Sequence, residues 1–140
     1  MISDTKVVAI GGGTGLSTML KGLKLHTHNI TAVVTVADDG GSSGILRSDL
    51  GMLAPGDVRN CVSALAEVDP VMGELLNFRF KDGSLKGHSL GNLFLAALNE
   101  TSSSFDEAVK KFSHLTGVVG TVYPVTNESV TLSALLEDGR

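Results

Sequence analysis

The segment at residues 11–15, GGGTG, has the composition of a phosphate-binding loop. Backbone N–H groups at the start of a helix carry partial positive charge, and a loop without bulky side chains lets a phosphate approach them closely. We therefore predict that Gly12, Gly13, Thr14 and Gly15 contact phosphate. The segment matches neither the G-x-G-x-x-G dinucleotide fingerprint nor a P-loop. The alternative explanation is a tight turn that needs a positive φ.

A second glycine-rich segment, DDGGSSG at residues 38–44, is acidic as well. Counted from the first glycine-rich segment, Asp38 lies near the roughly 20-residue spacing at which a Rossmann carboxylate binds a ribose hydroxyl. A second interpretation is that Asp38 and Asp39 together hold Mg²⁺ against a diphosphate. A solvated Asp-Gly turn is the third. The residues predicted to form this wall of the site are Asp38, Asp39, Gly40, Gly41, Ser42 and Ser43.

Polar residues also stand at two predicted helix starts. Asp57, which can cap a helix, is followed by Arg59 and Asn60. A base in the first turn opposes the helix dipole unless an anion is nearby, so Arg59 indicates an anion. Further along, His88 and Asn92 flank another helix start, and we expect them to donate hydrogen bonds to the same ligand. For His88 the alternative is a structural histidine whose hydrogen bonds are satisfied within the protein.

Residues 87–91, GHSLG, match the nucleophile-elbow pattern G-x-S-x-G. The elbow needs an apolar strand directly before it, whereas residues 81–86 are a polar turn, and only His114 follows as a triad base. The sequence therefore disfavours Ser89 as a nucleophile. Cys61 falls at a core-facing helical position and is most simply a small hydrophobic residue.

The elements that must position these residues alternate between strands and helices. Residues 6–10 and 30–37 are apolar, β-branched runs typical of buried parallel strands. A helical apolar period lies between them, so the three segments predict a βαβ unit. Helices are also predicted at residues 58–68, 71–80, 89–99 and, from a capping box at Ser104 and Glu107, 104–115. Two alternating segments, 118–125 and 129–136, pair as strands or return to the sheet.

These elements predict one domain over residues 1–140: a Rossmann-like, doubly wound parallel α/β sheet with helices on both faces. In such a fold ligands bind at the carboxyl ends of the strands, where both glycine-rich segments fall. Nothing follows the last predicted strand to cover it, so we expect the sheet to be incomplete.

Composition excludes several classes of protein. The 140 residues have a formal net charge of −4, which disfavours a sequence-independent grip on nucleic acid. The single cysteine excludes an internal disulfide and a multi-cysteine metal site, and it suits a cytoplasmic protein. No apolar run approaches the roughly 20 residues that span a bilayer. We therefore predict a cytoplasmic nucleotide-binding protein without a membrane span.

Four motifs occur in order along the chain: VVAIGGGTGLSTMLKGLK, TVADDGGSSGILR, PGDVRNCVSALAE and GHSLGNLFLAAL. Together they closely resemble the YvcK group of the bacterial CofD-like family, and the resemblance covers nearly the whole chain. It implies a Rossmann-like parallel sheet. Members of the family are considerably longer, so the resemblance also implies an amino-terminal fragment.

The resemblance implies two functions. YvcK-like proteins are cytoplasmic factors needed for gluconeogenic growth and normal cell shape, and they bind UDP-sugars such as UDP-N-acetylglucosamine. CofD proper transfers 2-phospho-L-lactate from a guanosine diphosphate derivative to a deazaflavin alcohol with Mg²⁺, and Asp57 lies near where it uses an aspartate beside the deazaflavin. The DDGGSSG and GHSLGN segments favour the YvcK branch, a regulatory nucleotide-sugar-binding protein that can form a homo-oligomer. Whether it is also an enzyme is left open, and the failed fingerprint disfavours an NAD dehydrogenase.

Overall fold

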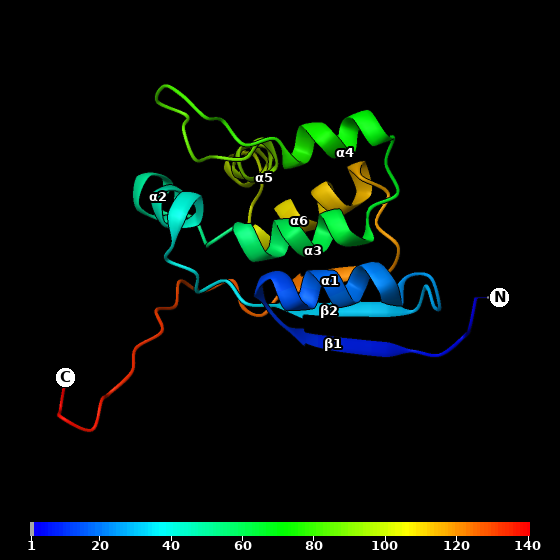
Figure 1. Cartoon of the computed structure of the whole chain (residues 1–140), viewed down its shortest axis with the longest axis horizontal. Coiled ribbons are helices and arrows are strands. Elements are labelled where there is room, and N and C mark those ends of the chain that lie inside the picture. Colours follow the sequence, from blue (N-terminus) through cyan, green and yellow to red (C-terminus); the bar gives the residue numbers. More distant parts are fainter. Residues whose placement is uncertain (1) are drawn as a thin grey trace.

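The computed structural model describes residues 2–140, and it contains three strands and six helices in that range (Figure 1). The strands are β1 (Val7–Gly11), β2 (Ile30–Val34) and β3 (Thr121–Pro124). The helices are α1 (Gly13–Leu23), α2 (Gly41–Leu50), α3 (Gly56–Leu65), α4 (Pro70–Asn77), α5 (Leu90–Glu100) and α6 (Phe105–Leu115).

The three strands form one parallel sheet in the order β1-β2-β3. Val7 pairs with Ile30, and Thr31 pairs with Thr121, so β2 lies in the centre. Parallel neighbours need a crossover connection, which α1 supplies between β1 and β2. The structure thus confirms the parallel α/β class and the predicted βαβ unit.

One face of the sheet is buried and the other is open. Side chains alternate across a strand, and Ala9, Ala32 and Val122 belong to the core beneath the helices. On the opposite face Val8 is 65% exposed and Ile10 is 76% exposed. Figure 1 shows the helices on one side of the sheet. Within residues 2–140 the helices therefore cover one face, whereas the prediction placed them on both.

The segment at residues 38–44 is the clearest difference in secondary structure, because only its first part is a turn. α2 begins at Gly41, whose φ of +48° is strained for other residues, and ends at Gly51 in the left-handed conformation. The glycines and serines therefore start a helix. Two successive helices, α2 and α3, consequently present their N-termini after β2.

The other predicted boundaries differ by a few residues. Pro55 stands at the N-cap of α3, which places Asp57 in the first turn. Ser104 caps α6 as predicted, with its Oγ 3.1 Å from the N–H of Glu107. Residues 118–125 contain β3, but no strand forms at residues 129–136.

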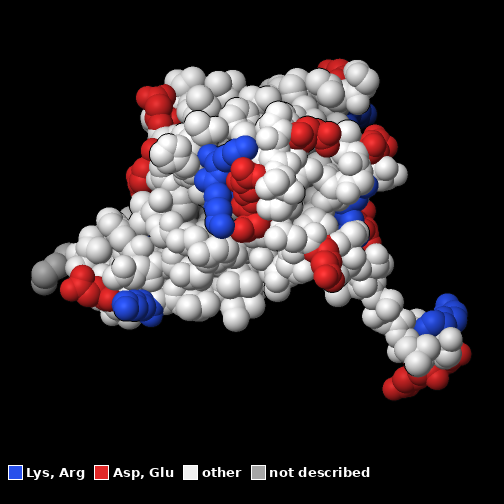
Figure 2. All heavy atoms as spheres, turned by 180° about the vertical axis from the view of Figure 1, so that it is seen from behind, with Lys and Arg blue, Asp and Glu red and all other residues white. Residues whose placement is uncertain are grey.

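The surface of residues 2–140 carries mixed charge. On the face seen in Figure 2, Lys and Arg lie beside Asp and Glu and do not form a continuous basic area. Two ion pairs on α6, Lys110–Asp106 at 3.0 Å and Lys111–Glu107 at 3.6 Å, follow this pattern. None of the described helices is long and apolar enough to cross a membrane.

Candidate functional site

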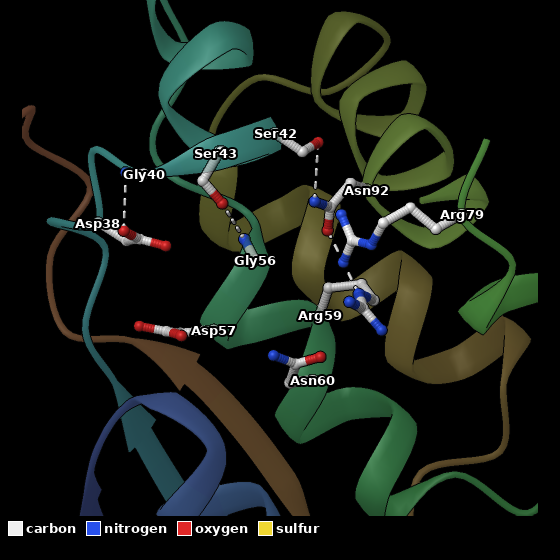
Figure 3. Close-up of a pocket in the computed structure, with 11 residues that line it drawn as sticks. Asp38, Gly40, Ser42, Ser43, Gly56, Asp57, Arg59, Asn60, Arg79 and Asn92 are labelled. Carbon is white, nitrogen blue, oxygen red and sulfur yellow. Dashed lines mark hydrogen bonds between the residues drawn. The ribbon is translucent and has the colours of Figure 1, made fainter. Parts of the chain in front are cut away.

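A cavity of about 260 Å³ opens where the first turns of α2, α3 and α5 converge (Figure 3). It follows the carboxyl end of β2, the edge at which parallel α/β sheets bind ligands. The residues that line it are Asp38, Gly40, Gly41, Ser42, Ser43, Gly56, Asp57, Arg59, Asn60, Arg79 and Asn92.

The starts of α2 and α3 meet closely at one wall of the cavity. The N–H of Gly56 donates to Ser43 Oγ at 3.0 Å, and a Cβ on Gly56 would collide with that oxygen. The N-cap residues of both helices lack a side-chain cap, so apart from the Gly56 N–H their first turns present backbone N–H groups without a capping acceptor. Such N–H groups attract anions.

The opposite wall carries two arginines. Arg59 on α3 is 5% exposed, and its stem passes Gly91 so closely that a Cβ there would lie 2.7 Å from Arg59 Cδ. Its Nε donates to Asn92 Oδ1 at 3.2 Å and its Nη1 to Asn77 Oδ1 at 2.9 Å. Among residues 2–140 no carboxylate forms an ion pair with Arg59. Burial, and then the charge of Arg79, lower the pKa of Arg59 to about 10.

Two like charges held together in this way favour an anion between or beside them. A buried guanidinium whose partners are two neutral amides keeps its full positive charge, and Arg79 adds a second. This wall is consequently suited to phosphate or carboxylate groups.

Two carboxylates face the cavity from the other side. Figure 3 shows Asp38 and Asp57 across from the two arginines. Burial, followed by the negative charge of Asp38, raises the pKa of Asp57, and the backbone N–H of Gly13 acts in the opposite direction. The pair that shares the cavity is therefore Asp38 with Asp57.

Asp39 does not line the cavity, although it is adjacent to Asp38 in sequence. Its Oδ1 lies 2.7 Å from Arg47 Nη1 on α2. In the described chain no three His, Cys, Asp or Glu side chains are grouped as a metal site. Two carboxylates plus substrate phosphates are a common set for Mg²⁺, and here Asp38 and Asp57 would be the protein's share of it.

The glycine loop lies behind Asp57 and outside the cavity lining. A Cβ on Gly12 would approach Asp57 Oδ2 to 3.1 Å, and the N–H of Gly13 influences the same carboxylate. Gly13 has a φ of +66°, as the tight-turn alternative requires. Thr14 and Gly15 belong to the first turn of α1. Phosphate binding by these four residues remains a prediction.

His88 and Ser89 are buried beside the cavity without lining it. His88 Nδ1 lies 2.7 Å from Ser42 Oγ, in agreement with the structural alternative for this histidine. Ser89 is fully buried and caps α5, with its Oγ accepting the N–H of Asn92 at 3.1 Å. In the described chain no basic side chain forms a hydrogen bond with Ser89 Oγ, and the neighbouring His88 contacts Ser42 instead, so Ser89 is not placed as a nucleophile. Burial, and then the charge of Asp57, raise the pKa of Cys61 to about 12, which fits the small hydrophobic residue that was predicted.

Two lining residues were not predicted. Gly56 lies inside the PGDVRN motif, and its closeness to Ser43 depends on the packing of two helices. Arg79 belongs to no motif. It follows α4 in a segment that returns to α5, where the N–H of Phe80 donates to His88 O at 2.9 Å. No local sequence signal identifies either residue.

The fold and the cavity define a class: a parallel α/β protein with a cavity after the carboxyl end of a strand, lined by arginines and by the first turns of helices. Its comparison with known proteins is more specific. The profile of the family described as 2-phospho-L-lactate transferase CofD matches residues 7–140, and the chain belongs to this family.

Individual relatives have a different name. The chain is 64% identical over 138 residues to a putative gluconeogenesis factor of Thermoanaerobacterium thermosulfurigenes, covering 99% of this chain and 43% of that protein. It is 52% identical over 136 residues to the gluconeogenesis factor of Bacillus subtilis, covering 96% and 43%. A crystal structure of a Bacillus halodurans protein superposes with a TM-score of 0.93 at 48% identity, covering 98% of this chain and 45% of that one. The chain thus spans less than half the length of these proteins, and the comparisons agree with the YvcK branch of the family.

Proposed function

We propose that the cavity binds the diphosphate of a nucleotide sugar, with UDP-N-acetylglucosamine as the first ligand to test. The observation that carries this proposal is the pair of arginines, Arg59 and Arg79, which face the cavity without an acidic partner at Arg59. A diphosphate accepts the two-pronged hydrogen bonds that guanidinium groups donate.

The size of the cavity agrees with a diphosphate. Sites for whole drug-sized ligands measure roughly 300–1,000 Å³, whereas this one measures about 260 Å³. The phosphates fit inside, and the uridine extends beyond the cavity.

In this proposal the protein is a regulatory factor of the YvcK type, cytoplasmic and needed for gluconeogenic growth and cell shape. Its relatives named gluconeogenesis factors, at up to 64% identity among those compared, support the gluconeogenic part of this role. The role of the site is then to sense a nucleotide sugar.

Arg79→Gln tests the site. Arg79 is exposed, so its substitution leaves the core intact. A hydrogen bond to a charged group contributes about 1.5–3 kcal/mol, so we expect at least a tenfold loss of affinity for UDP-N-acetylglucosamine in titration calorimetry. Lys81→Gln, an exposed residue of the same segment outside the cavity, is the control and should bind within about threefold of the wild type. Equal binding by Arg79→Gln would refute the assignment.

The second candidate is CofD-like phospholactate transfer with Mg²⁺. Asp38 and Asp57 favour it, because a cation between them would relieve the repulsion that helps to raise the pKa of Asp57. A thermal shift by GDP that requires Mg²⁺, and that Asp57→Asn removes, would support this candidate. A shift by UDP-N-acetylglucosamine that is independent of Mg²⁺ supports the regulatory factor.

A further inference from the structure

His88 ends a chain of buried hydrogen bonds that begins at the cavity. Arg59 Nε donates to Asn92 Oδ1 at 3.2 Å, Asn92 Nδ2 donates to Ser42 Oγ at 3.1 Å, and Ser42 Oγ lies 2.7 Å from His88 Nδ1. All four side chains are at most 7% exposed. Figure 3 shows the contacts of Asn92 with Ser42 and Arg59.

Arg59 fixes the direction of the hydrogen bonds in this chain as far as Ser42. A guanidinium only donates, so Asn92 must turn its oxygen toward Arg59 and its NH₂ toward Ser42. Ser42 Oγ accepts there, and among residues 2–140 its other partner is His88 Nδ1. We assign the hydroxyl hydrogen to Nδ1, because a hydrogen bond in the reverse direction would leave this buried hydroxyl without an acceptor in the described chain. His88 therefore accepts at Nδ1 and carries its own hydrogen on Nε2.

Ser42 also lines the cavity, so this assignment determines what its hydroxyl offers to a ligand. A hydroxyl has one hydrogen and two lone pairs. With the hydrogen given to His88 and one lone pair occupied by Asn92, Ser42 has a single lone pair left. Ser42 thus meets a ligand as an acceptor, although a serine at the start of a helix ordinarily offers a donor to phosphate.

We propose that His88 is a positioning residue that sets the specificity of the cavity through Ser42. By taking the hydroxyl hydrogen, it keeps phosphate oxygens away from Ser42 Oγ and leaves them to the guanidinium groups of Arg59 and Arg79 and to the backbone N–H groups of the helix starts. Ser42 then accepts from a ligand group that brings a hydrogen, a hydroxyl or an amide N–H next to the diphosphate. This inference rests on the proposed function, because it assumes that the cavity holds a diphosphate.

The test measures the affinity for inorganic pyrophosphate. In His88→Leu the Ser42 hydrogen has no acceptor and is free for the anion, so pyrophosphate should bind about tenfold more tightly than to the wild type. His88→Asn offers Oδ1 near the position of Nδ1 and should restore the wild-type affinity to within about threefold. The double substitution His88→Leu, Ser42→Ala should abolish the gain. A gain in affinity distinguishes positioning from a merely structural role, because damage to the fold weakens binding.

Unchanged or weaker pyrophosphate binding by His88→Leu, or an equal gain in His88→Asn, would overturn the proposal. An independent measurement is the ¹⁵N spectrum of the wild-type imidazole, with His88→Asn identifying the signal. We expect a hydrogen on Nε2 and none on Nδ1, and a hydrogen on Nδ1 would refute the assignment even if His88→Leu failed to fold. If the wild type binds neither pyrophosphate nor UDP-N-acetylglucosamine, the proposed function fails. The ¹⁵N spectrum then decides by itself whether Ser42 donates its hydrogen to His88.

Discussion

Asp57 holds a carboxylate where its charge is disfavoured. Burial and the neighbouring Asp38 raise its pKa above the ordinary 3.8 in the folded protein. A raised pKa adds stability that is fully present below pH 3.8 and is lost as the pH rises through the folded-state value. We therefore expect the free energy of unfolding of the wild type to decrease relative to that of Asp57→Asn as the pH rises from 3.8 through the folded-state pKa of Asp57, as measured by urea denaturation at a series of pH values.

Asp49→Asn provides the control for this measurement. Asp49 is exposed near the end of α2 and does not line the cavity. Its substitution should leave the pH dependence of the wild type in place. If the free energy of unfolding of Asp57→Asn depends on pH as steeply as that of the wild type, the Asp57 carboxyl is not the source of this pH dependence.

At the scale of elements, the passage from β1 into α1 depends on Gly12. A Cβ at this position would overlap with Thr35 Cγ2 and press on Asp57 Oδ2. Overpacking of this kind costs about 1–3 kcal/mol, so Gly12→Ala should lower the free energy of unfolding by that amount in urea denaturation. It should also displace Asp57 and weaken ligand binding.

Gly22 gives a control within the same helix. It lies in the last turns of α1, and a Cβ there would have no neighbour within 4 Å. Alanine is the better helix former, so Gly22→Ala should stabilise the protein by roughly 0.5–1 kcal/mol. A loss of stability in both variants would mean that α1 tolerates no added side chain, and the contact with Thr35 would no longer be the explanation.

At the scale of the whole molecule, the open face of the sheet is the largest departure from a finished α/β fold. Val8 and Ile10 are 65% and 76% exposed there. Exposed apolar surface of this kind promotes association, so we expect the 140-residue chain to self-associate as its concentration rises. The double substitution Val8→Thr, Ile10→Thr should reduce self-association in sedimentation velocity.

The stability of this double variant shows whether a change in self-association comes from the open face of the sheet or from damage to the fold. Both side chains are largely exposed and threonine suits a strand, so the free energy of unfolding should change by less than about 0.5 kcal/mol. A large loss of stability would mean that the two side chains are buried in solution. If the variant self-associates like the wild type and is equally stable, the surface through which the chains associate lies elsewhere.

The sequence by itself determined most of the elements, α2 and the last predicted strand excepted, and most of the residues that line the cavity. Local signals were enough to predict features that depend on a single segment of the chain. These features are the strands β1 and β2 from their apolar runs, the start of α6 from the cap at Ser104, and the grouping of Asp57, Arg59 and Asn60 at one helix start. Such features depend on residues within a turn or two of one another, and their physical cause is visible in the letters.

Tertiary structure alone decided which side chains share the cavity. Asp38 and Asp39 are adjacent, yet packing turns one to the cavity and the other to Arg47. Arg79 and His88 gain their roles from α3 and α2, because the contacts that define them join residues far apart in the chain. Contacts of this kind are set by how helices pack, and no local pattern of residue types encodes them.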